Sequence, residues 1–101
     1  MHVLLSLTRR VPGTQLAAYE RSWRRLHAAA GDAGAHAWRF RSAAASEPAR
    51  FLEFLEWHSD RPDPTAAGPL QQALAELDGA WPGEGETWQE VVGEHYQEGT
   101  P

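Results

Sequence analysis

The chain has 101 residues, so it fits one domain and is too short for two ordinary ones. Its net charge of −5 argues against a general nucleic-acid binder, which needs a basic face to neutralise phosphates. Because there is no cysteine, disulfides, thiol nucleophiles and thiolate metal sites are excluded. No apolar run approaches the roughly 18 residues of a membrane span, and the N-terminal stretch lacks the marks of a signal peptide. We therefore expect a cytoplasmic protein.

The first half of the sequence predicts a strand followed by a helix. Residues 2–9 alternate, with Val3, Leu5 and Leu7 on one face, as a half-buried strand does. After Pro12-Gly13, apolar residues recur at steps of 3, 4, 3 and 4, which is one stripe of an α-helix from 15 to about 30. The residues of this stripe are Leu16, Tyr19, Trp23, Leu26 and Ala30.

The second half predicts two further strands, a helix and a last strand. The strands span residues 35–43 and 50–58, with SAAASEPA as the turn between them. A helix from Pro69 to about Trp81 carries Leu70, Leu74 and Leu77 on one stripe. Residues 86–92 form the fourth strand. We assign residues 1–96 to one domain and residues 97–101 to a polar tail.

The order strand–helix–strand–strand–helix–strand indicates an α+β, ferredoxin-like fold. Right-handed crossovers give a four-stranded antiparallel sheet with both helices on one face. The other face then has no cover within the chain, although a half-apolar sheet face must be buried against something. The simplest cover is the same face of a second copy, which predicts a homodimer.

The second and third strands are expected to form a hairpin in which paired residue numbers sum to about 92. One face then carries Trp38 opposite Phe54 and His36 opposite Glu56, and the other carries Arg39 opposite Glu53. The first face also holds Phe40, Leu52 and His58. We assign this first, more apolar face to the helices, and the Arg39/Glu53 face to the partner chain. The reverse assignment remains the alternative.

The element order and the segment FLEFLEWHSD at 51–60 resemble the dimeric α+β barrel superfamily, and within it the antibiotic-biosynthesis-type monooxygenases. The match at residue level is Glu56-Trp57, where an apolar third strand ends in a polar turn. The resemblance implies a homodimer and oxygenation without a cofactor, acting on an easily deprotonated phenol or quinol.

Two departures from the family pattern limit what the resemblance implies. Family members often carry a histidine early in the second helical segment, whereas PTAAGPLQQALAEL has none. Haem-degrading relatives use an asparagine, and this chain contains no asparagine, so haem degradation loses support.

The sharpest candidate site is the cluster of His36, Glu56 and His58. Two imidazoles and a carboxylate on one face can move a proton or bind a divalent metal. The plain interpretation is a polar patch at the end of the sheet. We assign His36 and Glu56 as catalytic candidates, with either one as proton acceptor, and we assign no metal site.

The five tryptophans are many for this length and suggest an aromatic pocket between the sheet and the helices. The predicted ligand-binding residues are Trp23, Trp38, Phe40, Phe54 and His58. The plain interpretation is that large rings fill a small core.

Two functions follow as hypotheses. In the first, a homodimer binds a small hydrophobic or aromatic molecule and acts as a cofactor-independent monooxygenase. In the second, the dimer is a binding or interaction module without catalysis. No cofactor, nucleic acid or membrane is expected to take part.

Overall fold

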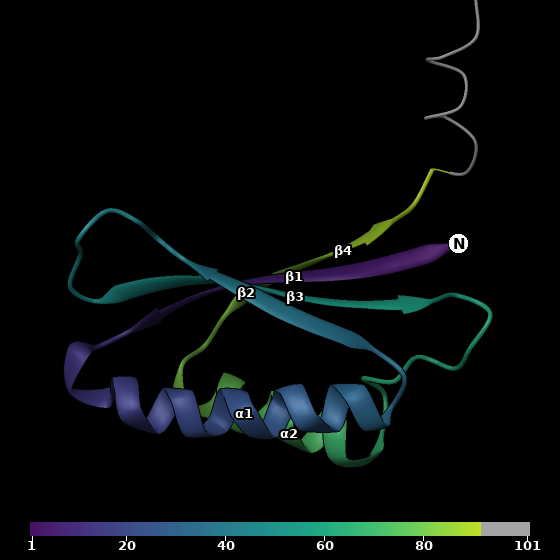
Figure 1. The fold of residues 1–101 in the computed structure, drawn as a ribbon, viewed down its shortest axis with the longest axis horizontal. Helices are drawn as coiled ribbons and strands as arrows, with labels where there is room; N and C mark the ends of the chain where they lie inside the picture. The colour runs from purple at the N-terminus through teal and green to yellow at the C-terminus, as the bar shows by residue number, and fades with distance from the viewer. Residues whose placement is uncertain (92–101) are drawn as a thin grey trace, which may run out of the picture.

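A four-stranded antiparallel sheet lies over two helices in the computed structural model, which describes residues 1–91 (Figure 1). The strands are β1 (His2–Val11), β2 (His36–Arg41), β3 (Ala49–His58) and β4 (Glu84–Gln89). The helices are α1 (Leu16–Asp32) and α2 (Gly68–Ala80), and a short 3-10 turn (Gly13–Gln15) precedes α1. The strand order β2-β3-β1-β4 is the ferredoxin-like order that the sequence predicts. The predicted tail at 97–101 and the last residues of the predicted domain lie outside the described residues.

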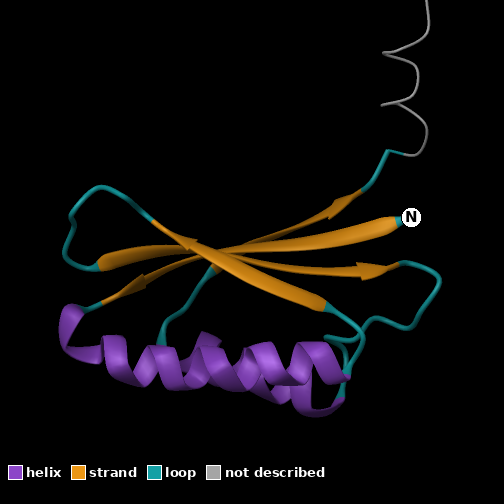
Figure 2. Ribbon diagram, in the orientation of Figure 1, coloured by secondary structure: helices purple, strands orange, loops and turns teal. Residues whose placement is uncertain are grey.

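Both helices lie on one side of the sheet, and no described element covers its other side (Figure 2). The predicted stripes face the sheet: Tyr19, Trp23 and Leu26 on α1 are buried. The α2 stripe is buried as well, since Leu70 and Leu77 are at most 1% exposed. Among residues 1–91, no helix is long and apolar enough to cross a membrane.

The predicted hairpin register is confirmed. β2 and β3 pair antiparallel with His36 opposite Glu56, Trp38 opposite Phe54, and Arg39 opposite Glu53. The same alternation places Trp38, Phe40, Leu52 and Phe54 on one common face of the sheet.

The assignment of that face to the helices is wrong, and the reverse assignment is correct. The side of β3 that meets the helices carries Phe51, Leu55 and Trp57, all at most 8% exposed. Phe40 on the opposite side is 59% exposed. The rings of Trp38, Phe40 and Phe54 therefore lie on the face that the helices leave uncovered, which we call the open face.

A buried network of polar side chains explains why the charged face turns inward. Arg9 on β1 and Glu53 on β3 are 1% and 2% exposed, and Arg9 Nε donates to Glu53 Oε1 at 2.7 Å. Tyr19 of α1 donates its hydroxyl to Glu53 Oε2 at 2.6 Å. Arg9 Nη1 also donates to Asp78 Oδ1 and to the Trp81 carbonyl oxygen. Because each charge has a partner, the face tolerates burial.

Arg39 is accommodated on the helix side by rings and by an ion pair. Its guanidinium carbon lies 4.9 Å from the Trp23 ring centroid and 5.3 Å from that of Tyr19. Arg39 Nη2 donates to Glu20 Oε2 at 2.5 Å. Arginine can thus cover an aromatic core while its charge remains compensated.

Replacing Arg9 by methionine should lower the free energy of unfolding by about 3–5 kcal/mol, because it leaves the Glu53 carboxylate buried without its counter-charge. Urea denaturation followed by tryptophan fluorescence measures the change. The double variant Arg9→Met/Glu53→Leu should recover a large part of the loss, since it removes both charges. A double variant no more stable than Arg9→Met would contradict the pairing.

Alkaline stability should depend on Tyr19. Burial first, and the Glu53 charge second, raises the pKa of the Tyr19 phenol above its usual value near 10. A raised pKa means that the folded state holds the proton more tightly, so this contribution is complete below about pH 10 and is lost as the pH rises further. Urea denaturation at pH 8 to 11 should show a steeper decline for the wild type than for Tyr19→Phe. Parallel declines would contradict the assignment.

Candidate functional site

The open face carries a layer of aromatic and aliphatic side chains. Trp38 stacks on Phe54 with ring centroids 5.2 Å apart and planes 21° apart, and Phe40 meets Phe54 edge-on at 6.1 Å. Leu52 and Trp88 continue the layer and are 36% and 50% exposed. This is a preformed, ring-lined surface of the kind that binds flat apolar molecules or a partner protein.

One end of the open face holds the histidines. His36 is opposite Glu56, and His58 is opposite His2. The His2 and His58 rings are 4.1 Å apart, and His2 Nδ1 lies 3.7 Å from Glu56 Oε1, too far for a hydrogen bond. The structure therefore brings His36, Glu56 and His58 to one end of one face, as predicted, and adds His2.

Sequence reasoning left His2 out of the cluster. The pairing of β1 with β3 brings it beside His58, and the alternation within one strand does not reveal such a pairing. The His36 ring also lies 4.8 Å from that of Trp38, so an imidazole adjoins the ring layer.

In the part of the chain that the structure describes, the cluster is not arranged to hold a metal ion. No group of three histidine, aspartate or glutamate side chains within residues 1–91 is placed to hold a metal ion. The metal alternative for the histidine cluster therefore has no support in the described part of the chain, and proton transfer remains as its candidate chemistry.

The prediction of a ligand pocket between the sheet and the helices is wrong, because its predicted residues do not meet there. Trp23 lies on α1 and is 7% exposed in the core, whereas Trp38, Phe40, Phe54 and His58 lie on the open face. The sheet separates Trp23 from the other four predicted ligand-binding residues. On the helix side, Tyr19 packs against Phe51 and against Trp81, so rings fill part of the core between the sheet and the helices.

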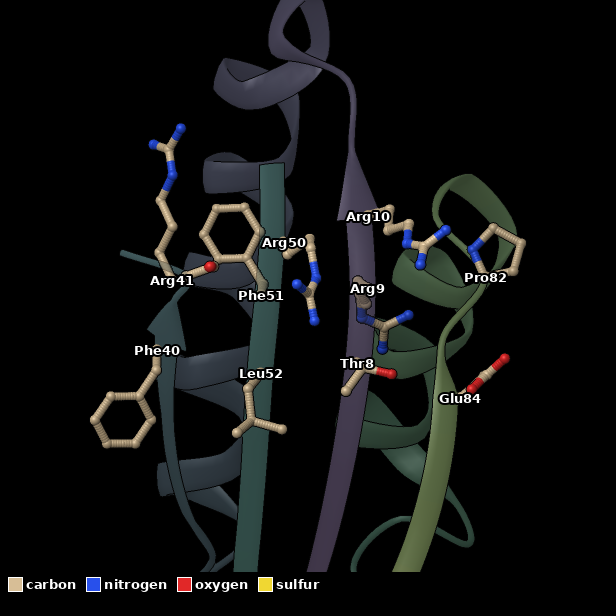
Figure 3. Close-up of a pocket in the computed structure, with 11 residues that line it drawn as sticks. Thr8, Arg9, Arg10, Phe40, Arg41, Arg50, Phe51, Leu52, Pro82 and Glu84 are labelled. Carbon is tan, nitrogen blue, oxygen red and sulfur yellow. The ribbon is translucent and has the colours of Figure 1, made fainter. Parts of the chain in front are cut away.

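A groove of about 620 Å³ crosses the other end of the sheet (Figure 3). It runs from the end of β2 across β3 and β1 to the start of β4. We call it the arginine groove; it is lined by Thr8, Arg9, Arg10, Phe40, Arg41, Ser42, Arg50, Phe51, Leu52, Pro82 and Glu84. Phe40 and Leu52 belong both to the groove and to the ring layer, so the two surfaces are continuous.

Sequence reasoning missed this groove. All nine basic residues of the chain are arginine, and the sequence analysis assigned no binding role to those that line the groove. Arg10 lies one residue beyond the predicted end of the first strand, and extending the alternation of Leu4, Ser6 and Thr8 would have placed it on the open face.

Comparisons with known proteins support the fold. No family model matches the chain, and no curated protein matches it. A Bacteroides thetaiotaomicron protein of unknown function, described as an oxidoreductase candidate, has a TM-score of 0.70 at 14% identity, covering 88% of this chain and 97% of that one.

Two further solved structures are named as a monooxygenase or an oxygenase. A Bordetella bronchiseptica protein, named as a candidate antibiotic biosynthesis monooxygenase, has a TM-score of 0.66 at 17% identity, covering 90% of this chain and 98% of its own. SnoaB of Streptomyces nogalater, a cofactor-independent oxygenase, has a TM-score of 0.66 at 14% identity, with 92% and 98% covered. At these identities the likeness concerns the fold. The chain has the ferredoxin-like α+β fold of the antibiotic biosynthesis monooxygenase-like proteins.

Proposed function

We propose that this protein is a homodimer whose open faces meet and bind a small aromatic molecule against their ring layer. The observation that carries the proposal is the open face itself, which presents Phe40, Leu52 and Trp88 to solvent. A continuous apolar surface of this kind marks a binding or association site in most proteins. Face-to-face packing of two sheets is a standard way to bury it.

Dimerisation would bury apolar side chains that remain exposed to water in the folded single chain. Full burial of a leucine or phenylalanine side chain contributes about 1.5–3 kcal/mol. Phe40 and Leu52 are exposed by 59% and 36%, so each retains part of that contribution for association. In a twofold dimer each such residue counts twice, because the same patch is used on both copies.

The ring layer suits a flat ligand. Trp38 and Phe54 already stack, and a planar molecule can extend such a stack or meet Phe40 edge-on. A second copy facing this layer would exclude water from the ligand and enclose it. The ligand site thus lies at the open face rather than beneath the sheet.

The enzymatic form of the proposal is oxygenation of a phenol without a cofactor. It is supported by the fold shared with SnoaB and by His36 and Glu56 beside the ring layer. His36 or Glu56 accepts the phenolic proton, molecular oxygen adds to the electron-rich ring carbon, and loss of water leaves a quinone. One oxygen atom enters the product and the other leaves as water.

The second candidate is a dimeric binding module without catalysis. The segment PTAAGPLQQALAEL favours it, because this segment lacks the histidine that members of the resembled monooxygenase family often carry there. Both candidates have the same dimer and the same ligand-binding surface, but only the first converts the ligand into a product.

The homodimer predicts twice the 11.2 kDa chain mass in solution. Sedimentation equilibrium at micromolar concentration should show the dimer for the wild type and the monomer for Phe40→Glu, which would bury a carboxylate in the interface. Gln71→Glu adds the same group on the exposed side of α2 and should remain dimeric. A monomeric wild type would refute the association.

The enzymatic form predicts oxygen consumption with an oxidisable phenol such as 1-naphthol. An oxygen electrode should record turnover that falls by about 10²–10⁴-fold when the proton acceptor is removed, as in His36→Gln or Glu56→Gln. Fluorescence titration of the tryptophans should show unchanged 1-naphthol binding in both variants. Binding of 1-naphthol by the wild type without oxygen consumption would assign the non-catalytic module.

A further inference from the structure

We infer that the arginine groove binds the acidic group of an aromatic carboxylate whose ring lies on the adjoining ring layer. The inference rests on the proposed function, because it names the chemical class of the aromatic ligand. It is carried by a juxtaposition of like charges that nothing in the described part of the chain compensates.

Arg10 and Arg50 are direct cross-strand partners. β1 and β3 pair antiparallel with Arg10 opposite Arg50, and both side chains belong to the open face. Opposite residues on one face have Cβ atoms about 4.5–5.5 Å apart, and like charges in that relation are destabilising. Within residues 1–91, neither guanidinium has an ion pair. A bound anion would convert this repulsion into two attractions.

A third arginine and two hydroxyl groups line the same groove. Arg41 lies at the end of β2 with its guanidinium carbon 5.7 Å from the Phe51 ring centroid. Thr8 and Ser42 add hydroxyl groups that can donate to an oxygen atom. The one acidic side chain in the lining is Glu84, at the β4 edge (Figure 3). In a chain of net charge −5, this is a local concentration of positive charge.

Arg9 supplies an independent indication of a missing partner. Its side chain is 0% exposed, and its Nη2 has no hydrogen-bond partner within the described residues. A buried donor without a partner is destabilising, and more so when the group is charged. Arg9 is among the residues that line the groove, so a donor without an acceptor lies next to the proposed site, although its side chain faces the helices.

The groove arises because β4 is shorter than its neighbour β1. β4 pairs with β1 from Val3 to Thr8, so Arg9 and Arg10 extend past the point where β4 begins. The volume of about 620 Å³ lies within the usual range for small-molecule sites, about 300–1,000 Å³.

The apolar part of the lining selects an organic anion over inorganic phosphate. Phe40 and Leu52 form the side of the groove that joins the ring layer. A carboxylate accepts two parallel hydrogen bonds from one guanidinium, and the attached ring would then lie over these apolar side chains. We therefore assign an aromatic carboxylate, with the carboxylate toward Arg10 and Arg50.

The test compares 2-naphthoate with 2-naphthamide, which has nearly the same shape and no charge. Isothermal titration calorimetry at low salt should give at least tenfold tighter binding for 2-naphthoate, with a preference that shrinks as salt rises. Arg10→Gln and Arg50→Gln should each weaken 2-naphthoate binding about tenfold and leave 2-naphthamide unchanged. The matched control is Arg24→Gln, an exposed arginine on α1 outside the groove lining, which should change neither affinity.

A second readout needs no ligand. Arg50→Gln should raise the thermal midpoint of the unliganded protein, because it removes the repulsion with Arg10, and should reduce the increase that 2-naphthoate produces. Equal affinities of the wild type for the two compounds would overturn the inference while leaving aromatic binding intact. Absence of binding by both would overturn the inference and the aromatic-ligand part of the proposed function together. An equal loss of affinity in Arg24→Gln would also overturn the inference, because it would show a general effect of charge.

Discussion

The contact on which this architecture depends is the buried ion pair between Arg9 and Glu53. Either charge alone on the inner face of the sheet would oppose packing against the helices, because a buried unpaired charge is strongly unfavourable. With the 2.7 Å contact made, and with the Tyr19 hydroxyl on the second carboxylate oxygen, both central strands can present this face to α1 and α2. The rings on the other face are consequently left outside, and the open face arises from the chemistry of the inner one.

Much of the fold could be predicted because it follows from short-range periodicity. The steps of three and four residues from Leu16 to Ala30 define the buried stripe of α1, and the turn position defines the register of Trp38 on Phe54. Periodicity separates the two faces of a strand but does not say which one is covered. That choice depends on partners such as Arg9 and Glu53, which are 44 positions apart in the sequence. Counting apolar residues favoured the wrong face. Arg39 and Glu53 were expected to pair with each other against the partner chain, whereas the structure pairs Glu53 with Arg9 and Arg39 with Glu20 beneath the sheet.

Like the fold, the candidate site could be predicted where it depends on short-range pairing within one hairpin. The grouping of His36, Glu56 and His58 depends on one hairpin and its register, and the structure brings these residues to one end of one face. His2 and the Arg10–Arg50 pair depend on the pairing of β1 with β3, two strands separated in the sequence by a helix and another strand. The open face therefore has a histidine end and an arginine end joined by aromatic rings. A ligand with one acidic end and one oxidisable end would match this polarity along the strands.

The outer strand β4 has a further consequence for dynamics. All six of its residues are exposed, and it lies at the edge of the sheet with β1 as its one strand neighbour in the described structure. The segment that leads into β4 is held by a hydrogen bond from Arg9 Nη1 to the Trp81 carbonyl oxygen at 2.9 Å. A strand without buried side chains belongs to the least protected part of a domain. Its amide protons are therefore expected to exchange with solvent ahead of those of β1 and β3, because β4 can separate locally from β1 while the core remains folded.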